Sequence, residues 1–145
     1  MTTDTLPPAL AEIVDLFAAS PPRDRLELLL EYSQQVPPLP ARYADHPELL
    51  EPVPECQSPL FVAAEVHADR RVQLFVSAPE EAPTTRGFAG IFHAGLNGLP
   101  ADEVLAVPGD VTARLSLNDV VSPLRLRGAA ALLGRVQQQV RAQLS

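Results

Sequence analysis

Proline recurs along this chain at the points where regular structure begins or stops. The sequence holds 16 prolines in 145 residues, well above the usual share of about 5%. Most of them lie between stretches of periodic hydrophobic residues. Because proline lacks a backbone N–H and has a fixed φ, it opens or ends helices and avoids central strands. We therefore expect short helices and strands joined by stiff connections.

Two amphipathic helices are predicted before residue 38. Thr5 and the prolines at 7 and 8 provide a start signal for the first helix. The second helix is expected to take Ser20 as its N-cap and Pro21 as its first helical residue, and to end at Pro37. The residues expected to face inward are Leu6, Leu10, Ile13, Val14 and Phe17 in the first helix, and Leu26, Leu29, Leu30, Ser33 and Val36 in the second.

The segment 37–58 is rich in proline and is predicted to have little regular structure. From residue 60 the hydrophobic period changes to two, which indicates strands over about 60–66 and 72–78. Residues 68–71 fit a hairpin connection between them. A two-stranded hairpin is marginal alone, so it has to pack on helices or pair with a third strand, which we place around residues 51–53.

Four more helices are expected after the hairpin. Thr84 is the predicted N-cap of a helix that ends at Asn97-Gly98, and its three glycines suggest that another backbone passes close to it. Short helices are expected after Pro100 and after Asp110. The last helix starts at Ser122-Pro123 and has a long stripe of inward residues, namely Leu126, Ala130, Leu133, Val136, Val140 and Leu144.

Together these elements predict an α+β fold in which a small antiparallel sheet of two or three strands packs against several helices, as one domain over residues 1–145. The formal charge of −7 argues against nucleic acid as a partner. No apolar run reaches the roughly 18 residues that span a bilayer, and the first residues lack a secretory signal. A single cysteine permits no internal disulfide, so we expect a cytoplasmic protein.

Neither a metal nor a cofactor is expected. The histidines at 46, 67 and 93 have no ligand spacing between them or to the cysteine. The glycines at 87, 90 and 95 do not follow a strand in a phosphate-binding pattern.

Cys56 is the residue with the clearest chemical potential. A lone cysteine is commonly a small buried hydrophobe, but this one has proline, acidic and amide neighbours on a loop before a strand, which favours exposure. An exposed thiol can take part in thiol exchange. Glu55 disfavours the thiolate, so a nearby cation or a partner would have to activate it. Composition alone does not decide whether Cys56 is a buried structural residue or a reactive thiol.

Three blocks of the sequence, taken in order, resemble the SufE family of sulfur acceptors. The first is Cys56-Gln57-Ser58 opening a strand after two helices. The second is Ser77-Ala78-Pro79 followed by Arg86-Gly87. The third is the run 121–128, Val-Ser-Pro-Leu-Arg-Leu-Arg-Gly, at the start of the last helix. The resemblance covers the chain from about residue 8 and implies the SufE/IscU-like fold.

What the resemblance implies is a sulfur relay that needs no cofactor on this chain. Cys56 would accept persulfide sulfur from a pyridoxal-phosphate-dependent (SufS-like) cysteine desulfurase, stimulate that enzyme, and pass the sulfur to a SufBCD-like scaffold for iron–sulfur cluster assembly. Gln57 and Ser58 would shape the cysteine loop. Arg125, a cation in the first helical turn where the dipole disfavours it, would have a supporting role or be an ordinary surface residue. Arg86 would contact a partner or anchor a loop.

Two other classes of function stay open from the sequence. A stand-alone thiol enzyme would need a histidine base or a cationic pocket, and no obvious histidine partner accompanies Cys56. A pure interaction module, in which Cys56 is incidental, would bind its partner and stimulate a desulfurase without the thiol.

Overall fold

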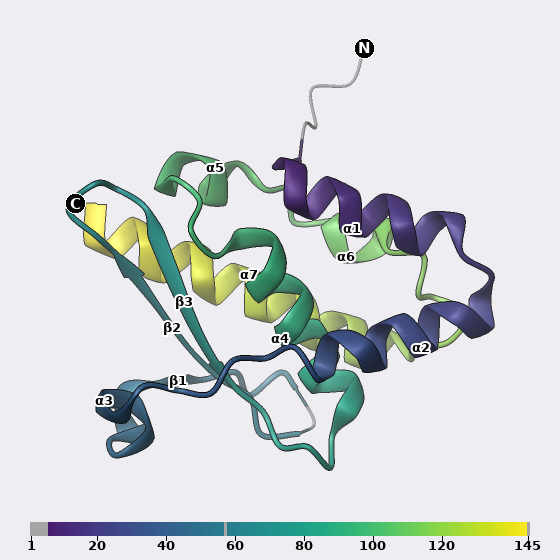
Figure 1. Cartoon of the computed structure of the whole chain (residues 1–145), viewed down its shortest axis with the longest axis horizontal. Helices are drawn as coiled ribbons and strands as arrows, with labels where there is room; N and C mark the ends of the chain where they lie inside the picture. Colours follow the sequence, from purple (N-terminus) through teal and green to yellow (C-terminus); the bar gives the residue numbers. More distant parts are fainter. Residues whose placement is uncertain (1–5, 57, 145) are drawn as a thin grey trace.

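A computed structural model describes residues 6–144 of the chain, except residue 57. Thr5, part of the predicted start of the first helix, lies outside the described residues. Within the described part the chain forms helices and a three-stranded sheet (Figure 1). In order these are α1 (Pro8–Ala19), α2 (Pro22–Ser33), α3 (Ala41–Ala44), the 3-10 turn η1 (Pro47–Leu49), β1 (Glu51–Pro52), β2 (Phe61–Val66), β3 (Val72–Ser77), α4 (Pro83–Leu96), α5 (Ala101–Ala106), α6 (Val111–Arg114) and α7 (Pro123–Leu144).

The sheet has the order β1-β2-β3, and both pairs are antiparallel. β2 and β3 pair along their whole length, and residues 67–71 form the turn between them, as the alternating pattern predicts. The third strand expected around residues 51–53 is also present, with Glu51 opposite Val62. Because β1 is only two residues long, most of the outer edge of β2 has no neighbouring strand.

Helices cover one face of the sheet in two layers (Figure 1). α7 lies against β2, α4 lies against β3 and α7, and α1 and α2 pack on α4. The buried core between these elements is almost entirely aliphatic and aromatic. The predicted α+β class, with a small antiparallel sheet packed against several helices, is confirmed.

Residues 37–50 cover part of the other face of the sheet, and the prediction of little regular structure over 37–58 is partly wrong. α3, η1 and β1 all lie within it. The reason is aromatic packing: the ring of Tyr43 in α3 lies 4.7 Å from the ring of Phe75 in β3. With Leu50 and Ala63 these two side chains form a second small core.

Proline starts most of the long helices, but two predicted caps are wrong. α2 begins at Pro22 rather than Pro21, and the hydroxyl of Ser20 donates to the carbonyl of Leu16 in the preceding helix (2.8 Å). Thr84 is not the N-cap of α4, because Pro83 already starts that helix. The Ser122 cap of α7 is confirmed, since Ser122 Oγ accepts a hydrogen bond from the backbone N–H of Arg125 (3.3 Å).

The glycines of α4 let α2 approach it, as their presence suggested. A Cβ placed on Gly87 would lie 2.5 Å from the carbonyl oxygen of Leu29, and one on Gly90 would overlap the carbonyl of Tyr32. Only glycine allows two helices to meet at this separation. Among the described elements α4 is the main neighbour of α2, so only the stripe of α2 that faces α4 is buried.

Leu26 and Leu30 were expected to face inward. They are instead 39% and 36% exposed. Leu29, Ser33 and Val36 are buried as predicted. In α1, Leu10, Ile13 and Phe17 are buried, and the same holds for the central part of the predicted stripe of α7. Asp110 precedes α6, but its carboxylate pairs with Arg114 (3.1 Å) rather than capping the helix.

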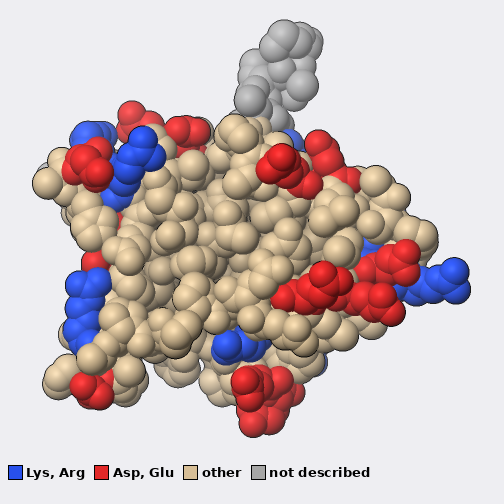
Figure 2. Space-filling model, viewed as in Figure 1, with Lys and Arg blue, Asp and Glu red and all other residues tan. Residues whose placement is uncertain are grey.

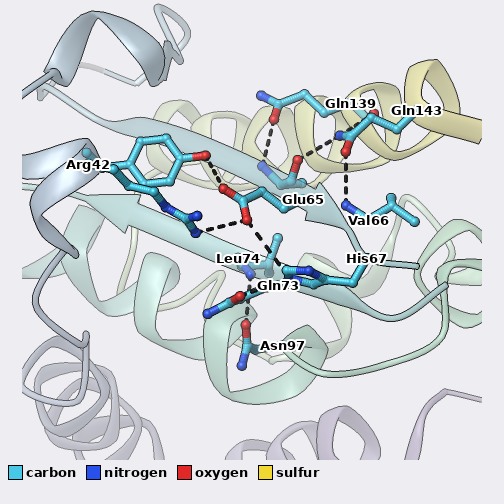
Figure 3. A network of polar contacts seen from close by, with 11 residues as sticks. Arg42, Glu65, Val66, His67, Gln73, Leu74, Asn97, Gln139 and Gln143 are labelled. Atoms are coloured by element: carbon cyan, nitrogen blue, oxygen red, sulfur yellow. Dashed lines mark hydrogen bonds and ion pairs between the residues drawn. The ribbon is translucent and has the colours of Figure 1, made fainter. Parts of the chain in front are cut away.

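Two glutamines of α7 take the place of a strand along the outer edge of β2 (Figure 3). Gln139 Oε1 accepts from the backbone N–H of Ala64 (2.7 Å), and Gln143 Oε1 accepts from that of Val66 (2.9 Å). Gln143 Nε2 also donates to the carbonyl of Ala64 (2.7 Å). Unpaired strand edges invite pairing with other chains, and these amides occupy the exposed backbone groups instead.

Polar side chains also form hydrogen bonds with the backbone of β3 and across the outer face of the sheet (Figure 3). Asn97 Oδ1 accepts from the backbone N–H of Leu74 in β3 (2.8 Å). The carboxylate of Glu65 accepts from Arg42 (2.9 Å) and from the hydroxyl of Tyr43 (2.6 Å). Burial, followed by the neighbouring Glu65, raises the pKa of Tyr43 to about 12. The tyrosine therefore stays a hydrogen-bond donor at physiological pH.

On the face shown in Figure 2, the charged side chains lie mostly toward the outline, and uncharged side chains fill the centre. The net charge of the chain is −7. Among the described residues, no helix is both long and apolar enough to span a bilayer.

Candidate functional site

Cys56 lies in the loop between β1 and β2. The backbone N–H of Val53 donates to the carbonyl of Leu60 (2.8 Å), which closes the base of this loop. The N–H of Cys56 donates to the carbonyl of Val53 (3.1 Å), so the residues just before the cysteine form a tight turn. Val53 and Leu60 are buried, whereas Cys56 is only half-buried. The core thus fixes the two ends of the loop, and Cys56 between them packs partly against the same core.

The surface beneath the thiol belongs to the first turns of α7. A Cβ placed on Gly128 would lie 2.7 Å from Cys56 Sγ and 3.2 Å from Cys56 Cα. Gly128 therefore provides a gap in the helix surface into which the cysteine fits. Any larger residue at this position would push the loop outward.

Two hollows meet at Cys56. The inner one is a narrow cleft with only about 10 Å³ of free space between the loop, α4 and α7, and Arg125 lines it together with Leu60, Thr85, Phe88 and Ala129. The outer one is an open groove of about 250 Å³ along the loop itself, lined by Ser58 and several prolines. The thiol thus stands between an apolar cleft on one side and the solvent-facing surface on the other.

Three influences act on the ionisation of Cys56. Burial is the largest and raises the pKa of the thiol, and the carboxylate of Glu55 raises it further. The guanidinium of Arg125 acts in the opposite direction and lowers the pKa. Because the net shift of the pKa is upward, the thiol is mainly protonated near neutral pH and is not activated by this chain alone.

The other residues singled out in the sequence occupy different places. Ser58 lies on the outer groove next to Cys56, and Gln57 lies outside the described residues. Arg86 does not line either hollow at the cysteine. Its Nε donates to the carbonyl of Ser33 (2.8 Å) and its Nη1 to the carbonyl of Ala78 (2.6 Å), which ties α2 and the end of β3 to α4.

A comparison with protein families decides the relationship. The model of the SufE family, described as an Fe-S metabolism associated domain, matches residues 11–140. The chain belongs to the SufE family. Its family therefore connects it with iron–sulfur metabolism.

Individual relatives agree with this membership. Two uncharacterized SufE-like proteins from Mycobacterium tuberculosis strains are 50% identical over 94% of each chain. A chloroplastic/mitochondrial SufE-like protein 1 from Arabidopsis thaliana is 30% identical over 94% of this chain, which spans 36% of that longer protein. The solution structure of a hypothetical protein from Thermus thermophilus matches with a TM-score of 0.84 and 41% identity, over 97% of this chain and 98% of the other.

Within this SufE-family site, Arg135 was missed by the sequence analysis, and Gly128 entered it only as the last residue of the run 121–128, without a role at the cysteine. Arg135 Nη1 lies 2.6 Å from the carboxylate of Glu51, and its Nη2 lies 3.1 Å from both carboxylate oxygens of Glu55. The available signal was position on the helix: Gly128 and Arg135 are seven residues apart and so share one face of α7. That face is the one turned toward the cysteine loop.

The described residues include no group of three or more His, Cys, Asp or Glu side chains that could hold a metal ion. The groups that lie together at this site are the thiol of Cys56 and the guanidinium of Arg125, which lines the inner cleft with it.

Proposed function

We propose that this chain is a sulfur carrier that accepts persulfide sulfur on Cys56 and activates the enzyme that supplies it. The observation that carries the proposal is a single half-buried thiol on a loop between two hollows, in a chain of the SufE family. The donor is a pyridoxal-phosphate-dependent, SufS-like cysteine desulfurase. The final acceptor is a SufBCD-like scaffold on which iron–sulfur clusters are assembled.

The transfer is an exchange at sulfur and needs no oxidant. The thiolate of Cys56 attacks the outer sulfur of a persulfide held on the desulfurase cysteine. A new S–S bond forms at Cys56 Sγ while the old S–S bond breaks, and the desulfurase cysteine leaves as a thiolate. The transferred sulfur keeps its proton or loses it to solvent, so electrons and atoms balance.

The environment of the thiol suits a carrier that works only with its partner. Because the pKa of Cys56 is raised, chiefly by burial, the free protein keeps the thiol mainly protonated and weakly nucleophilic. Moving the loop out of the cleft removes part of that burial and brings the pKa down. We infer that docking on the desulfurase both exposes and activates Cys56.

The same surroundings favour a carrier over a stand-alone thiol enzyme. Such an enzyme activates its cysteine with an adjacent base, commonly histidine. Among the described residues that line the two hollows at Cys56 there is no histidine. The cytoplasm, where thiols are kept reduced, is the compartment in which we place the reaction.

Intact mass spectrometry tests the proposal directly. The protein is incubated with a SufS-type desulfurase and free cysteine, and we expect an adduct of about +32 Da, the mass of one sulfur atom. Because the chain has one cysteine, the adduct reports on Cys56 alone. The Cys56→Ser variant is expected to show no adduct, and it should also lose stimulation of the desulfurase.

Other outcomes would contradict the proposal. An active cognate desulfurase that leaves no adduct on the wild-type chain would exclude sulfur acceptance. Stimulation that survives in Cys56→Ala would point instead to an interaction module. Rapid oxidation of Cys56 by peroxide without any protein partner would point to a thiol enzyme.

A further inference from the structure

Arg135 connects the cysteine loop to α7 through two carboxylates. Its Nη1 donates to Glu51 in β1 (2.6 Å), and its Nη2 donates to both oxygens of Glu55 (3.1 Å each). Glu55 directly precedes Cys56 in the chain. One guanidinium thus holds the start of the loop and the residue next to the thiol.

The position of Glu51 is fixed independently of Arg135. Gln139 Nε2 donates to the other oxygen of the Glu51 carboxylate (2.8 Å), and Glu51 also pairs with Val62 in the sheet. Glu55, by contrast, is exposed, and among the described residues its side chain pairs with Arg135. Within the described part of the loop, this ion pair therefore ties the residue before Cys56 to the helix.

The orientation of Arg135 indicates that bridging determines its conformation. Its Nε is buried and has no hydrogen-bond partner among the described residues. Leaving such a donor unpaired costs free energy, so the guanidinium is turned to satisfy the two carboxylates instead. A planar fork with donors on two sides suits this task, whereas a lysine offers a single point charge.

The charged groups that face Cys56 come from its own loop and from α7. Glu55 disfavours the thiolate, and Arg125 favours it. The residues of α4 that line the cleft, Thr85 and Phe88, carry no charge. Glu55 is also the carboxylate that pairs with Arg135, so the residue before Cys56 is tied to the same helix on which Cys56 packs at Gly128.

We propose that Arg135 is a positioning residue that clamps the cysteine loop onto α7 through Glu55, and that release of this clamp frees Cys56 for sulfur transfer. The use of the freed thiol rests on the proposed function, whereas the clamp itself is a property of the free protein. A partner that offers a cation to Glu55, or an anion to Arg135, would open it.

The rate of Cys56 alkylation by iodoacetamide, measured against pH, tests the clamp without any desulfurase. The limiting rate above the pKa reports how often the loop exposes the thiol, separately from its ionisation. We expect Arg135→Gln to raise this limiting rate about 5- to 10-fold, as for loss of a charge-assisted pair. Arg127→Gln, an exposed arginine of the same helix, should leave it unchanged.

A second variant and salt separate a clamp from general loosening of the fold. Glu55→Gln removes the same link from the other side at an exposed position, and we expect the double variant to react no faster than Arg135→Gln alone. Salt screens exposed ion pairs, so the limiting rate of the wild type should rise about 2-fold at high ionic strength and that of Arg135→Gln should not.

Additive effects of the two substitutions, or an unchanged limiting rate in both single variants, would overturn the clamp. Neither result would affect sulfur acceptance, which the mass adduct on Cys56 tests separately. Equally, a missing adduct together with a fast Arg135→Gln variant would retain the clamp and reject the proposed carrier function.

Discussion

The two ends of α7 hold the sheet side of the molecule in different ways. Toward the C-terminus, Gln139 and Gln143 use both atoms of their amides to bond the backbone of β2 (Figure 3). Toward the N-terminus, Gly128 meets Cys56 through shape alone, and no hydrogen bond to the thiol sulfur is found among the described residues. The first region is held by hydrogen bonds to the backbone of β2, whereas in the second the thiol itself is held by packing, beside the ion pair of Arg135 with Glu55.

This difference suits what each region has to do. A backbone group that loses its partner while buried costs about 1–3 kcal/mol, so the amide-capped edge resists opening. A packed contact on a glycine can be exchanged for a contact on another protein with little loss. Segments that move for function come from the less stable parts of a fold. We infer that the cysteine loop opens more readily than the edge of β2 that the two glutamines hold.

The largest expected effect comes from filling the gap beneath Cys56. In Gly128→Ala the new Cβ would lie 2.7 Å from Cys56 Sγ, too close for the loop to keep its place. We expect the limiting rate of Cys56 alkylation to rise about 10-fold, which corresponds to about 1.4 kcal/mol of lost docking free energy. This rate is measured by quenching the alkylation reaction at a series of times and determining the modified fraction by mass spectrometry.

Gly134→Ala provides the matched control on the same helix. A Cβ at Gly134 meets nothing within 4 Å, so alkylation should stay at the wild-type rate. Helix propensity alone should stabilise this variant by about 0.5–1 kcal/mol. Equal alkylation rates in the two variants would show that Gly128 does not hold the loop.

A smaller effect, on stability rather than on reactivity, is expected at the other end of α7. Gln143→Leu removes the bonds to the N–H of Val66 and the carbonyl of Ala64. Chemical denaturation should show a free energy of unfolding lower by about 1 kcal/mol, while the alkylation rate of Cys56 stays unchanged. The exposed Gln138 is the control, and Gln138→Leu should change the stability by less than about 0.5 kcal/mol.

A change in Cys56 reactivity in Gln143→Leu would break the comparison between the two ends of α7. It would mean that the capped edge and the cysteine loop open together, as one cooperative unit, instead of independently.

How much the sequence predicts depends on the range of the interaction involved. The two-residue period over 60–66 and 72–78 is local, and it predicted β2, β3 and the turn between them. The Ser122-Pro123 signal is local as well, and it predicted the start of α7. Ser20-Pro21 has the same form but failed, because a second proline follows and Pro22 becomes the first helical residue.

The parts that could not be predicted depend on contacts between distant segments. Leu26 and Leu30 fit a helical stripe, but α2 packs mainly on α4, so the flanks of that stripe stay exposed. The position of Cys56 before a strand could be foreseen from the pattern. The contact of Cys56 with Gly128 and the bond between Arg135 and Glu55 could not be foreseen, because each joins residues more than 70 positions apart.

The smallest expected effect concerns the charge of Arg125 and the pKa of the Cys56 thiol. Arg125 lines the inner cleft with Cys56 and lowers the pKa of the thiol, against the larger upward influences of burial and Glu55. Without this cation the pKa rises further and the thiolate fraction at pH 8 falls. We expect Arg125→Gln to slow alkylation at pH 8 about 2- to 3-fold, since partly exposed charges interact weakly.

The pH profile distinguishes this effect from a change in loop position. If Arg125 acts through charge, the profile shifts to higher pH while its limiting rate stays equal to that of the wild type. Arg127→Gln, two residues along the helix and exposed, should leave both quantities unchanged. A higher limiting rate with an unshifted profile would mean that Arg125 holds the loop mechanically. The cysteine loop would then be held in place by Arg125 as well as by Arg135 and the gap at Gly128.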